Sequence, residues 1–330
     1  MKKILNDMQN IVQEMCEGML AAHPEILHFD RESKVVSRKT PNPDKVSLIS
    51  GGGSGHEPAH AGYVGVGMLD AAVCGDVFAS PSTIQVYRAL QRTRSNKGTL
   101  LIVKNYSGDC MNFDGAAEMA EDDGIVVERV YVNDDVAVKD SLYTVGRRGV
   151  AGTFFVHKIA GAAAERLYDL AEVKRVAEKV IENVRSIGFA LTSCTVPAKG
   201  TPTFLLADNE MEYGVGIHGE PGIAREPIQQ AHELAHRMVT QILAEPAMQG
   251  IREAAVLVNG FGSTPLMELY VMNKNICEAL ESRGVQCVKV LVGNYMTSLD
   301  MCGASLSVLR LDDEIKELLV DPAVTAAVVF

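Results

Sequence analysis

The chain of 330 residues contains no tryptophan, and aromatic residues make up only 5% of it. Hydrophobic residues nevertheless reach 47%. The cores must therefore be built from valine, leucine, isoleucine, alanine and methionine. A chain of this length can form two domains, each with a sizeable core.

Positive charge is also scarce, since 31 Lys and Arg residues face 42 Asp and Glu residues and leave a net charge of −11. Such a surface repels phosphate backbones and anionic membranes, so neither nucleic acid nor a membrane is an expected partner. A phosphorylated ligand would have to meet positive charge that is concentrated locally.

Three further absences concern the compartment. The seven cysteines include no C-x-x-C pair, as is typical of reduced cytosolic thiols. The first residues, beginning Met1-Lys2-Lys3, lack the apolar run of a signal peptide. No stretch approaches the roughly 18 uninterrupted apolar residues that a membrane span needs. We therefore expect a cytoplasmic protein.

The first half of the chain alternates between strand-like and helix-like patterns. An amphipathic helix is predicted from Ile4 to Leu20. Near-continuous apolar runs predict buried strands at 45–50, 99–104 and 125–132, and helices are predicted at 116–120, 150–167 and 171–184. This alternation predicts an α/β domain over residues 1–182, with a doubly wound, mostly parallel sheet.

The pattern changes after about residue 182. Strands are predicted at 186–193, 204–207, 254–258, 285–291 and 305–311, with the last of them closing the chain, and helices at 228–243 and 266–282. We expect a second, smaller α+β domain over residues 183–330.

A glycine-rich stretch, Gly51-Gly52-Gly53-Ser54-Gly55-His56-Glu57-Pro58, follows the first buried strand. Four glycines in five positions leave the backbone N–H groups open to a ligand, and His56 adds a group that can exchange a proton near neutral pH. Such a loop is either a flexible turn or part of a site. The residues after Pro58 are expected to open a helix.

A second loop, Lys104–Asp109, leaves the carboxyl end of another predicted strand, and ligands of open α/β sheets bind at such ends. Asp109 could serve as a general base or as a helix N-cap. Lys104 could belong to the site or cover the rim of the sheet. His218 lies among glycines, where an imidazole could be a ligand, a base, a nucleophile or a loop histidine bonded to backbone.

Two pattern matches do not predict a site. Residues 214–219 satisfy G-x-G-x-x-G, but Pro221 and Gly222 prevent the helix that should follow. His232 and His236 satisfy H-E-x-x-H, but no third zinc ligand is recognisable downstream. The chain also lacks the G-x-x-x-x-G-K-[ST] phosphate loop. We expect this chain to bind no metal and no nucleotide cofactor.

Five longer motifs resemble the dihydroxyacetone kinases. They are GGGSGHEP at 51–58, KNYSGD at 104–109, NDDVAVKDSLYTVGRRG at 133–149, CTVP at 194–197 and ADNEMEYGVGIHGEPG at 207–222. The resemblance continues through NYMTSLDM at 294–301. Within this family, the sequence resembles more specifically the dihydroxyacetone-binding subunits of the phosphotransferase-system type. The ATP-dependent members continue into a helical nucleotide-binding domain at the point where this sequence ends.

The resemblance implies roles for particular residues. His218 would attack the ketone carbon of dihydroxyacetone to form a covalent hemiaminal, and Asp109 would be the general base toward the hydroxyl to be phosphorylated. His56 would bond the substrate, and the remaining predicted substrate-binding residues are Gly53, Ser54, Gly55 and Lys104. An imidazole of ordinary pKa at His218 would lose the ketone below about pH 6.

The resemblance also implies partners. A separate helical subunit carrying Mg-ADP, recharged by a phosphohistidine carrier, would supply the phosphoryl group, and the chain would form a homodimer. The alternative is a non-catalytic paralogue that senses dihydroxyacetone and signals to a transcription factor. Such a sensor would keep His218 and the glycine loop, whereas intact Asp109 and His56 favour the kinase subunit.

Overall fold

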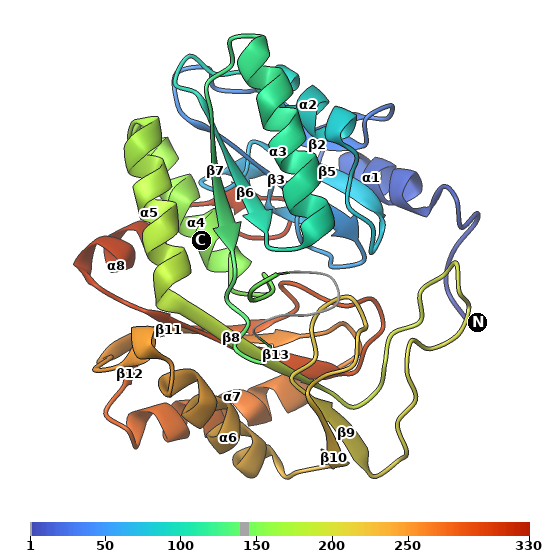
Figure 1. Ribbon diagram of the computed structural model, residues 1–330, viewed down its shortest axis with the longest axis vertical. Helices are drawn as coiled ribbons and strands as arrows, with labels where there is room; N and C mark the ends of the chain where they lie inside the picture. Colours follow the sequence, from blue (N-terminus) through green and yellow to red (C-terminus); the bar gives the residue numbers. More distant parts are fainter. Residues whose placement is uncertain (1, 139–144) are drawn as a thin grey trace.

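The structure is a computed structural model, and it describes residues 2–138 and 145–330. Within these residues the strands form two six-stranded sheets and one two-stranded ribbon (Figure 1). No helix in the described ranges is both long enough and apolar enough to cross a membrane.

The first sheet has the order β1-β2-β5-β3-β6-β7. Its four strands β5, β3, β6 and β7 are parallel, whereas β1 and β2 form an antiparallel edge. The strands are β1 (Leu27–Asp30), β2 (Val35–Arg38), β3 (Ser47–Ser54), β5 (Ala71–Val77), β6 (Thr99–Lys104) and β7 (Val127–Val132). Every residue of β3 and β6 is buried, as the continuous apolar runs predict for strands covered on both faces.

The second sheet has the order β10-β9-β8-β13-β11-β12, and only β11 and β12 are parallel neighbours. Its strands are β8 (Val184–Ala190), β9 (Glu210–Tyr213), β10 (Ala224–Pro227), β11 (Glu253–Gly260), β12 (Gln286–Gly293) and β13 (Gly303–Arg310). The predicted fold class, a mostly parallel α/β half followed by an α+β half, is confirmed.

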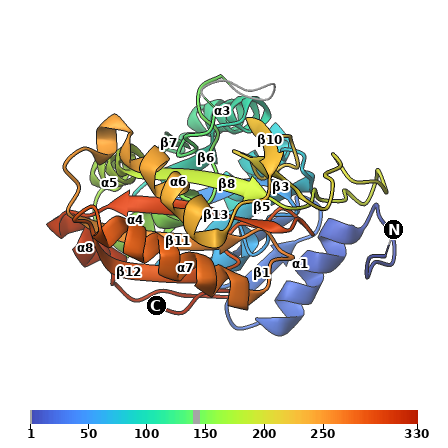
Figure 2. The ribbon, with the colours of Figure 1, turned by 90° about the horizontal axis from the view of Figure 1, so that it is seen from below.

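The helices form three layers around the two sheets. Helices α2 (Thr83–Arg92) and α3 (Ser107–Asp122) pack on the outer face of the first sheet (Figure 1). Helices α6 (Ala231–Leu243) and α7 (Leu266–Glu281) pack on the outer face of the second sheet and lie in front of it in Figure 2. Helices α4 (Thr153–Glu165) and α5 (Leu170–Asn183) lie between the sheets, and α1 (Ile11–Ala22) and α8 (Asp313–Leu319) border this middle layer.

Helix α4 is buried on all sides from Thr153 to Ala164. A helix without a polar face belongs in the centre of a core. The core around it joins Ile102 of the first sheet, Phe154 of α4 and Leu257 of the second sheet. The two halves therefore share one apolar core, and the predicted domain boundary near residue 182 stays a prediction.

Several predicted elements differ from the observed ones. Strand β3 does not end at residue 50 but continues to Ser54, because the glycines pair with β5. The helix expected after Pro58 is only a 3₁₀ turn, Ala61–Tyr63. The N-terminal helix begins at Ile11 instead of Ile4.

The predicted strand at 204–207 is absent, because β9 takes the place beside β8. The chain does not close with β13. Helix α8 follows, and β14 (Val324–Thr325) then returns to the first half, where it pairs with β4 (Gly65–Val66). Such pairings depend on residues far away in the sequence, so local periodicity does not predict them.

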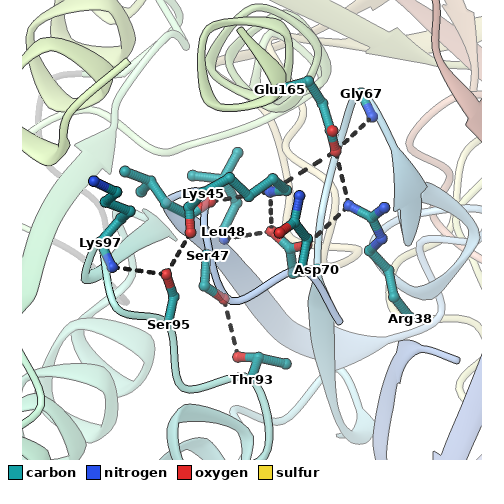
Figure 3. Close-up of polar contacts among 12 residues, drawn as sticks. Arg38, Lys45, Ser47, Leu48, Gly67, Asp70, Thr93, Ser95, Lys97 and Glu165 are labelled. Atoms are coloured by element: carbon teal, nitrogen blue, oxygen red, sulfur yellow. Dashed lines mark hydrogen bonds and ion pairs between the residues drawn. The ribbon is translucent and has the colours of Figure 1, made fainter. Parts of the chain in front are cut away.

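A buried ionic cluster joins β2, β3, β5 and the end of α4 (Figure 3). The Lys45 ammonium, fully buried, lies 2.6 Å from Asp70 Oδ2, which also accepts the Leu48 N–H at 2.9 Å. The Arg38 guanidinium contacts both Asp70 Oδ1 at 3.1 Å and Glu165 Oε1 at 2.7 Å. Asp70 therefore neutralises a cation that has no access to water.

We expect Asp70→Asn to lower the free energy of unfolding by about 3–5 kcal/mol, because it leaves the Lys45 and Arg38 cations to share the Glu165 carboxylate. The asparagine keeps an oxygen that can accept the Leu48 N–H, so the loss of stability measures the effect of removing the negative charge. Urea unfolding at pH 7 measures it.

The matched control is Glu278→Gln, which breaks the exposed ion pair between Lys274 and Glu278 on α7. Exposed pairs contribute about 0–1 kcal/mol. An Asp70→Asn loss no larger than that of the control would contradict the role given to the cluster.

Candidate active site

A pocket of about 530 Å³ lies beyond the carboxyl ends of β3 and β6. The first half lines it with Gly53, Phe78, Tyr106 and Asp109, and the second half with residues that include His218. This is the edge at which parallel α/β sheets bind ligands. The two glycine-rich motifs, 160 residues apart in the chain, thus meet at one cavity.

Asp109 lies in the first turn of α3 and is 2% exposed. The N-cap position belongs to Tyr106, so the N-cap interpretation of Asp109 is wrong. Its Oδ1 atom has no hydrogen-bond partner among the described residues. Burial raises the pKa of Asp109, and the nearby Lys104 ammonium opposes that shift. The side chain is a carboxylate of increased basicity that faces the cavity.

Lys104 does not cover the rim of the sheet but lies fully buried beneath the pocket. Its Nζ atom is 3.2 Å from the Gly51 carbonyl oxygen and 3.9 Å from Asp109 Oδ2. Burial lowers the pKa of Lys104, and Asp109 opposes this. A Cβ on Gly52, whose φ is +146°, would lie 2.5 Å from Nζ, so the glycine leaves room for the ammonium.

His56 is completely buried and has a defined tautomer. Its Nδ1–H donates a hydrogen bond to the Thr297 carbonyl at 2.8 Å, so Nε2 carries the lone pair. Nε2 has no partner among the described residues. Burial, followed by the proximity of His218 and Lys104, holds the pKa of His56 well below its usual value. His56 is therefore a neutral hydrogen-bond acceptor.

The His218 ring is enclosed by aromatic rings. Its centroid lies 4.4 Å from Tyr106, 4.8 Å from His56 and 5.5 Å from Phe78, each in an edge-on arrangement. Burial, followed by the charges of Lys104 and Arg148, lowers the pKa of His218 to about 3. The imidazole is neutral at pH 7 and keeps its lone pair. The limit of about pH 6 applies to an imidazole of ordinary pKa, and a lowered pKa moves it to lower pH.

An ionic clamp holds the loop that carries His218. Glu220 Oε2 accepts the His218 backbone N–H at 3.0 Å, and Oε1 is 2.9 Å from Arg148 Nη1. Arg148 also contacts Asp135 at 2.6 Å and donates to the Gly214 carbonyl at 3.0 Å. A Cβ on Gly216 would lie 2.1 Å from Glu220 Oε1, so this glycine leaves space for the clamp. No helix follows residues 214–219, in line with the rejected nucleotide pattern.

The other predicted substrate-binding residues differ in position. Gly53 lines the pocket. The Ser54 hydroxyl donates to the Gly75 carbonyl at 2.7 Å, and the Gly55 N–H donates to Glu57 at 3.0 Å. Both groups are engaged within the protein, and their contact with a substrate stays a prediction.

Sequence reasoning did not single out three residues of the site. Phe78 has a positive φ of 55° and stacks on His56 at 5.1 Å, and no local pattern indicates either feature. Tyr106 stands inside the quoted KNYSGD motif, and its buried hydroxyl has no partner among the described residues. Ser80 lines the pocket beside Asp109.

The H-E-x-x-H pattern lies on α6, away from these groups. Its His236 Nε2 is 2.8 Å from Arg283 Nη2, and the ring is exposed. Over residues 2–138 and 145–330 no three metal-binding side chains gather. Residues 139–144 of the NDDVAVKDSLYTVGRRG motif lie outside the described ranges.

The sequence profile of the Dak1 domain matches residues 17–327. This chain belongs to the Dak1 domain family. It is 53% identical over 314 residues to the Listeria innocua PTS-dependent dihydroxyacetone kinase 1, dihydroxyacetone-binding subunit DhaK, with 95% of each chain covered. It is 42% identical over 352 residues to the Escherichia coli PEP-dependent dihydroxyacetone kinase, dihydroxyacetone-binding subunit DhaK, with 99% of each chain covered.

A solved structure with a TM-score of 0.90 is the dihydroxyacetone kinase operon co-activator Dha-DhaQ. It is 36% identical, and the match covers 95% of this chain and 97% of that one. The Dak1 fold therefore occurs both in kinase subunits and in a co-activator. The fold alone does not distinguish these functions, and the distinction rests on the site.

Proposed function

We propose that this chain is the dihydroxyacetone-binding subunit of a phosphotransferase-system, phosphoenolpyruvate-dependent dihydroxyacetone kinase. The observation that carries the proposal is the convergence of a neutral His218 and a buried Asp109 carboxylate on one pocket. Similarity to the Listeria innocua subunit over 95% of both chains supports it.

His218 is the proposed nucleophile. A ring nitrogen with a free lone pair attacks the ketone carbon, and the carbonyl π electrons move to oxygen. The oxygen gains a proton and the imidazole loses the one on its other nitrogen, which leaves a neutral hemiaminal. A covalent bond fixes a ketone with few atoms for binding, and glycerol is rejected because it has no carbonyl.

Asp109 is the proposed general base. Its raised pKa suits it to accept the proton of the hydroxyl as that oxygen attacks phosphorus. Lys104 below it favours the ionised carboxylate before the reaction. The Nε2 lone pair of His56 is available to a hydroxyl of the ketone. Each group of the pocket thus has one chemical task.

The phosphoryl donor is proposed to be a helical subunit that carries Mg-ADP and is recharged by a phosphohistidine carrier. No cofactor is assigned to the chain itself. A homodimer is also proposed. The apolar side chains exposed together on α7 support it, because such a stripe is suited to contact with a second copy, and they are Leu266, Met267, Tyr270 and Val271.

The second candidate is a non-catalytic, dihydroxyacetone-sensing co-activator, a function that the solved structure of Dha-DhaQ, with a TM-score of 0.90, shows to be compatible with this fold. A sensor needs the ketone bound but needs no base. The buried Asp109 carboxylate, whose Oδ1 makes no hydrogen bond within the described residues, favours the kinase subunit, since burying such a group is costly without a function.

We expect the purified chain to form no dihydroxyacetone phosphate from Mg-ATP and dihydroxyacetone. Phosphoryl transfer depends on a positioned metal–nucleotide, and the chain has no phosphate loop to hold one. Adding the helical ADP-bearing subunit with its phosphoenolpyruvate-driven relay should start turnover, measured as pyruvate release. ATP-dependent turnover by the chain alone would refute the phosphotransferase assignment, and inactivity in the full system would favour the co-activator.

We expect Asp109→Asn to abolish turnover in the full system while the ketone still binds at His218, because the two tasks belong to different residues. A loss of four decades corresponds to about 5.5 kcal/mol of barrier. Pyruvate release measures turnover, and crystal density measures binding. Near wild-type turnover would rule out Asp109 as the base.

We expect a crystal soaked in dihydroxyacetone to show continuous density from a His218 ring nitrogen to the ketone carbon. Because the pKa of His218 is lowered to about 3, the lone pair persists as pH falls through 6.5 and is lost only near pH 3. Occupancy at pH 5 should therefore equal that at pH 7. A ketone at hydrogen-bonding distance would contradict the covalent assignment, whereas release of a covalently bound ketone at pH 6 would contradict the lowered pKa of His218.

A further inference from the structure

A chain of buried polar groups leads away from the pocket below Lys104. Lys104 Nζ is 2.8 Å from His60 Nε2, and His60 Nδ1 is 2.9 Å from His157 Nε2. His60 follows β3, Lys104 ends β6 and His157 lies on α4. The exposed fractions are 0% for Lys104, 5% for His60 and 0% for His157, so water does not compete for these contacts.

The hydrogen bonds admit one arrangement of protons. The Ser50 hydroxyl donates to the Ile102 carbonyl at 2.7 Å, so it does not donate to His60 Nδ1 at 3.4 Å. The Lys104 ammonium has only donors, so His60 Nε2 accepts. His60 Nδ1 then carries a proton and donates to His157 Nε2. His157 keeps its own proton on Nδ1, which has no partner among the described residues.

Both imidazoles in this chain are neutral. Burial, followed by the Lys104 charge, lowers the pKa of His60 well below its usual value and that of His157 to about 3. A protonated His60 would place two cations 2.8 Å apart. The histidines that feel the Lys104 charge are His56, His60, His157 and His218, and Asp109 also acts on the thiol of Cys110, whose pKa is raised. The four imidazoles and this thiol are neutral at pH 7, so Lys104 is the charge that acts on Asp109.

We propose that His60 and His157 are positioning residues that hold the Lys104 ammonium beneath Asp109 and thereby set the proton affinity of the base. Among the described residues, the ammonium has two close acceptors, which are His60 and the Gly51 carbonyl. His157 fixes His60 in the tautomer that accepts. The inference rests on the proposed function, because it assigns these residues to the base of that reaction.

The test uses His60→Leu, which removes the acceptor, and His60→Gln, whose side-chain oxygen can replace Nε2. In His60→Leu the Lys104 ammonium loses an acceptor and is no longer held beside Asp109. Without that nearby positive charge the pKa of Asp109 rises, so the acid limb of the kcat–pH profile should move up by at least about one pH unit. His60→Gln should restore most of the wild-type profile. The covalent bond between His218 and dihydroxyacetone should still form, since His60 is not among the residues that line the pocket.

The matched control is His232→Leu, the same change at an exposed histidine of α6, and its profile should equal that of the wild type. If the wild type is active and the acid limb of the kcat–pH profile of folded His60→Leu is unshifted, this inference is overturned while the proposed function stands. An inactive wild-type system would instead contradict the proposed function.

A second measurement needs no activity. Nitrogen-15 spectra of the histidine rings, assigned with His60→Gln and His157→Gln, report tautomer and charge. We expect His60 and His157 as neutral Nδ1–H forms from pH 5 to pH 8, although free imidazole side chains titrate near 6.5. An Nε2–H form of His60, or its protonation in this range, would overturn the inference even if His60→Leu failed to fold.

Discussion

The Lys104 ammonium is buried where β3, β6 and α4 meet, and the candidate site is arranged around the need to compensate this charge. A buried cation requires acceptors and a counter-charge. The Gly51 carbonyl and His60 provide the acceptors, and Asp109 provides the negative charge. The same cation disfavours protonation of the surrounding histidines and so keeps their lone pairs available.

The second half of the protein completes this arrangement. The Thr297 carbonyl accepts a hydrogen bond from Nδ1–H of His56. Glu220, paired with Arg148 of the first half, accepts the backbone N–H of His218. The common core around α4 fixes the two sheets relative to each other. Because both halves contribute to one pocket, the distance between the proposed nucleophile and the proposed base depends on this packing and on neither half alone.

The two glycine-rich motifs look alike in sequence, and they make room for ionic groups of opposite charge. The glycines at 51–53 belong to a paired strand, and the side chain missing at Gly52 makes room for a buried ammonium. The glycines around His218 make room for a carboxylate instead, since a Cβ at Gly216 would meet Glu220. In both places the glycine serves an ionic contact below the surface of the pocket.

The sequence by itself determined the fold class, because buried parallel strands and amphipathic helices leave periodic patterns, and it placed Asp109 and His218 in long motifs. It did not determine the full length of β3, the return of the chain through α8 and β14, or the place of Phe78. Only the tertiary structure decided that burial and nearby positive charges lower the pKa of His218 and that His157 faces His60. The reason is physical: periodicity is local, whereas burial and neighbouring charge arise between residues far apart in the sequence, such as His60 and His157 at a separation of 97.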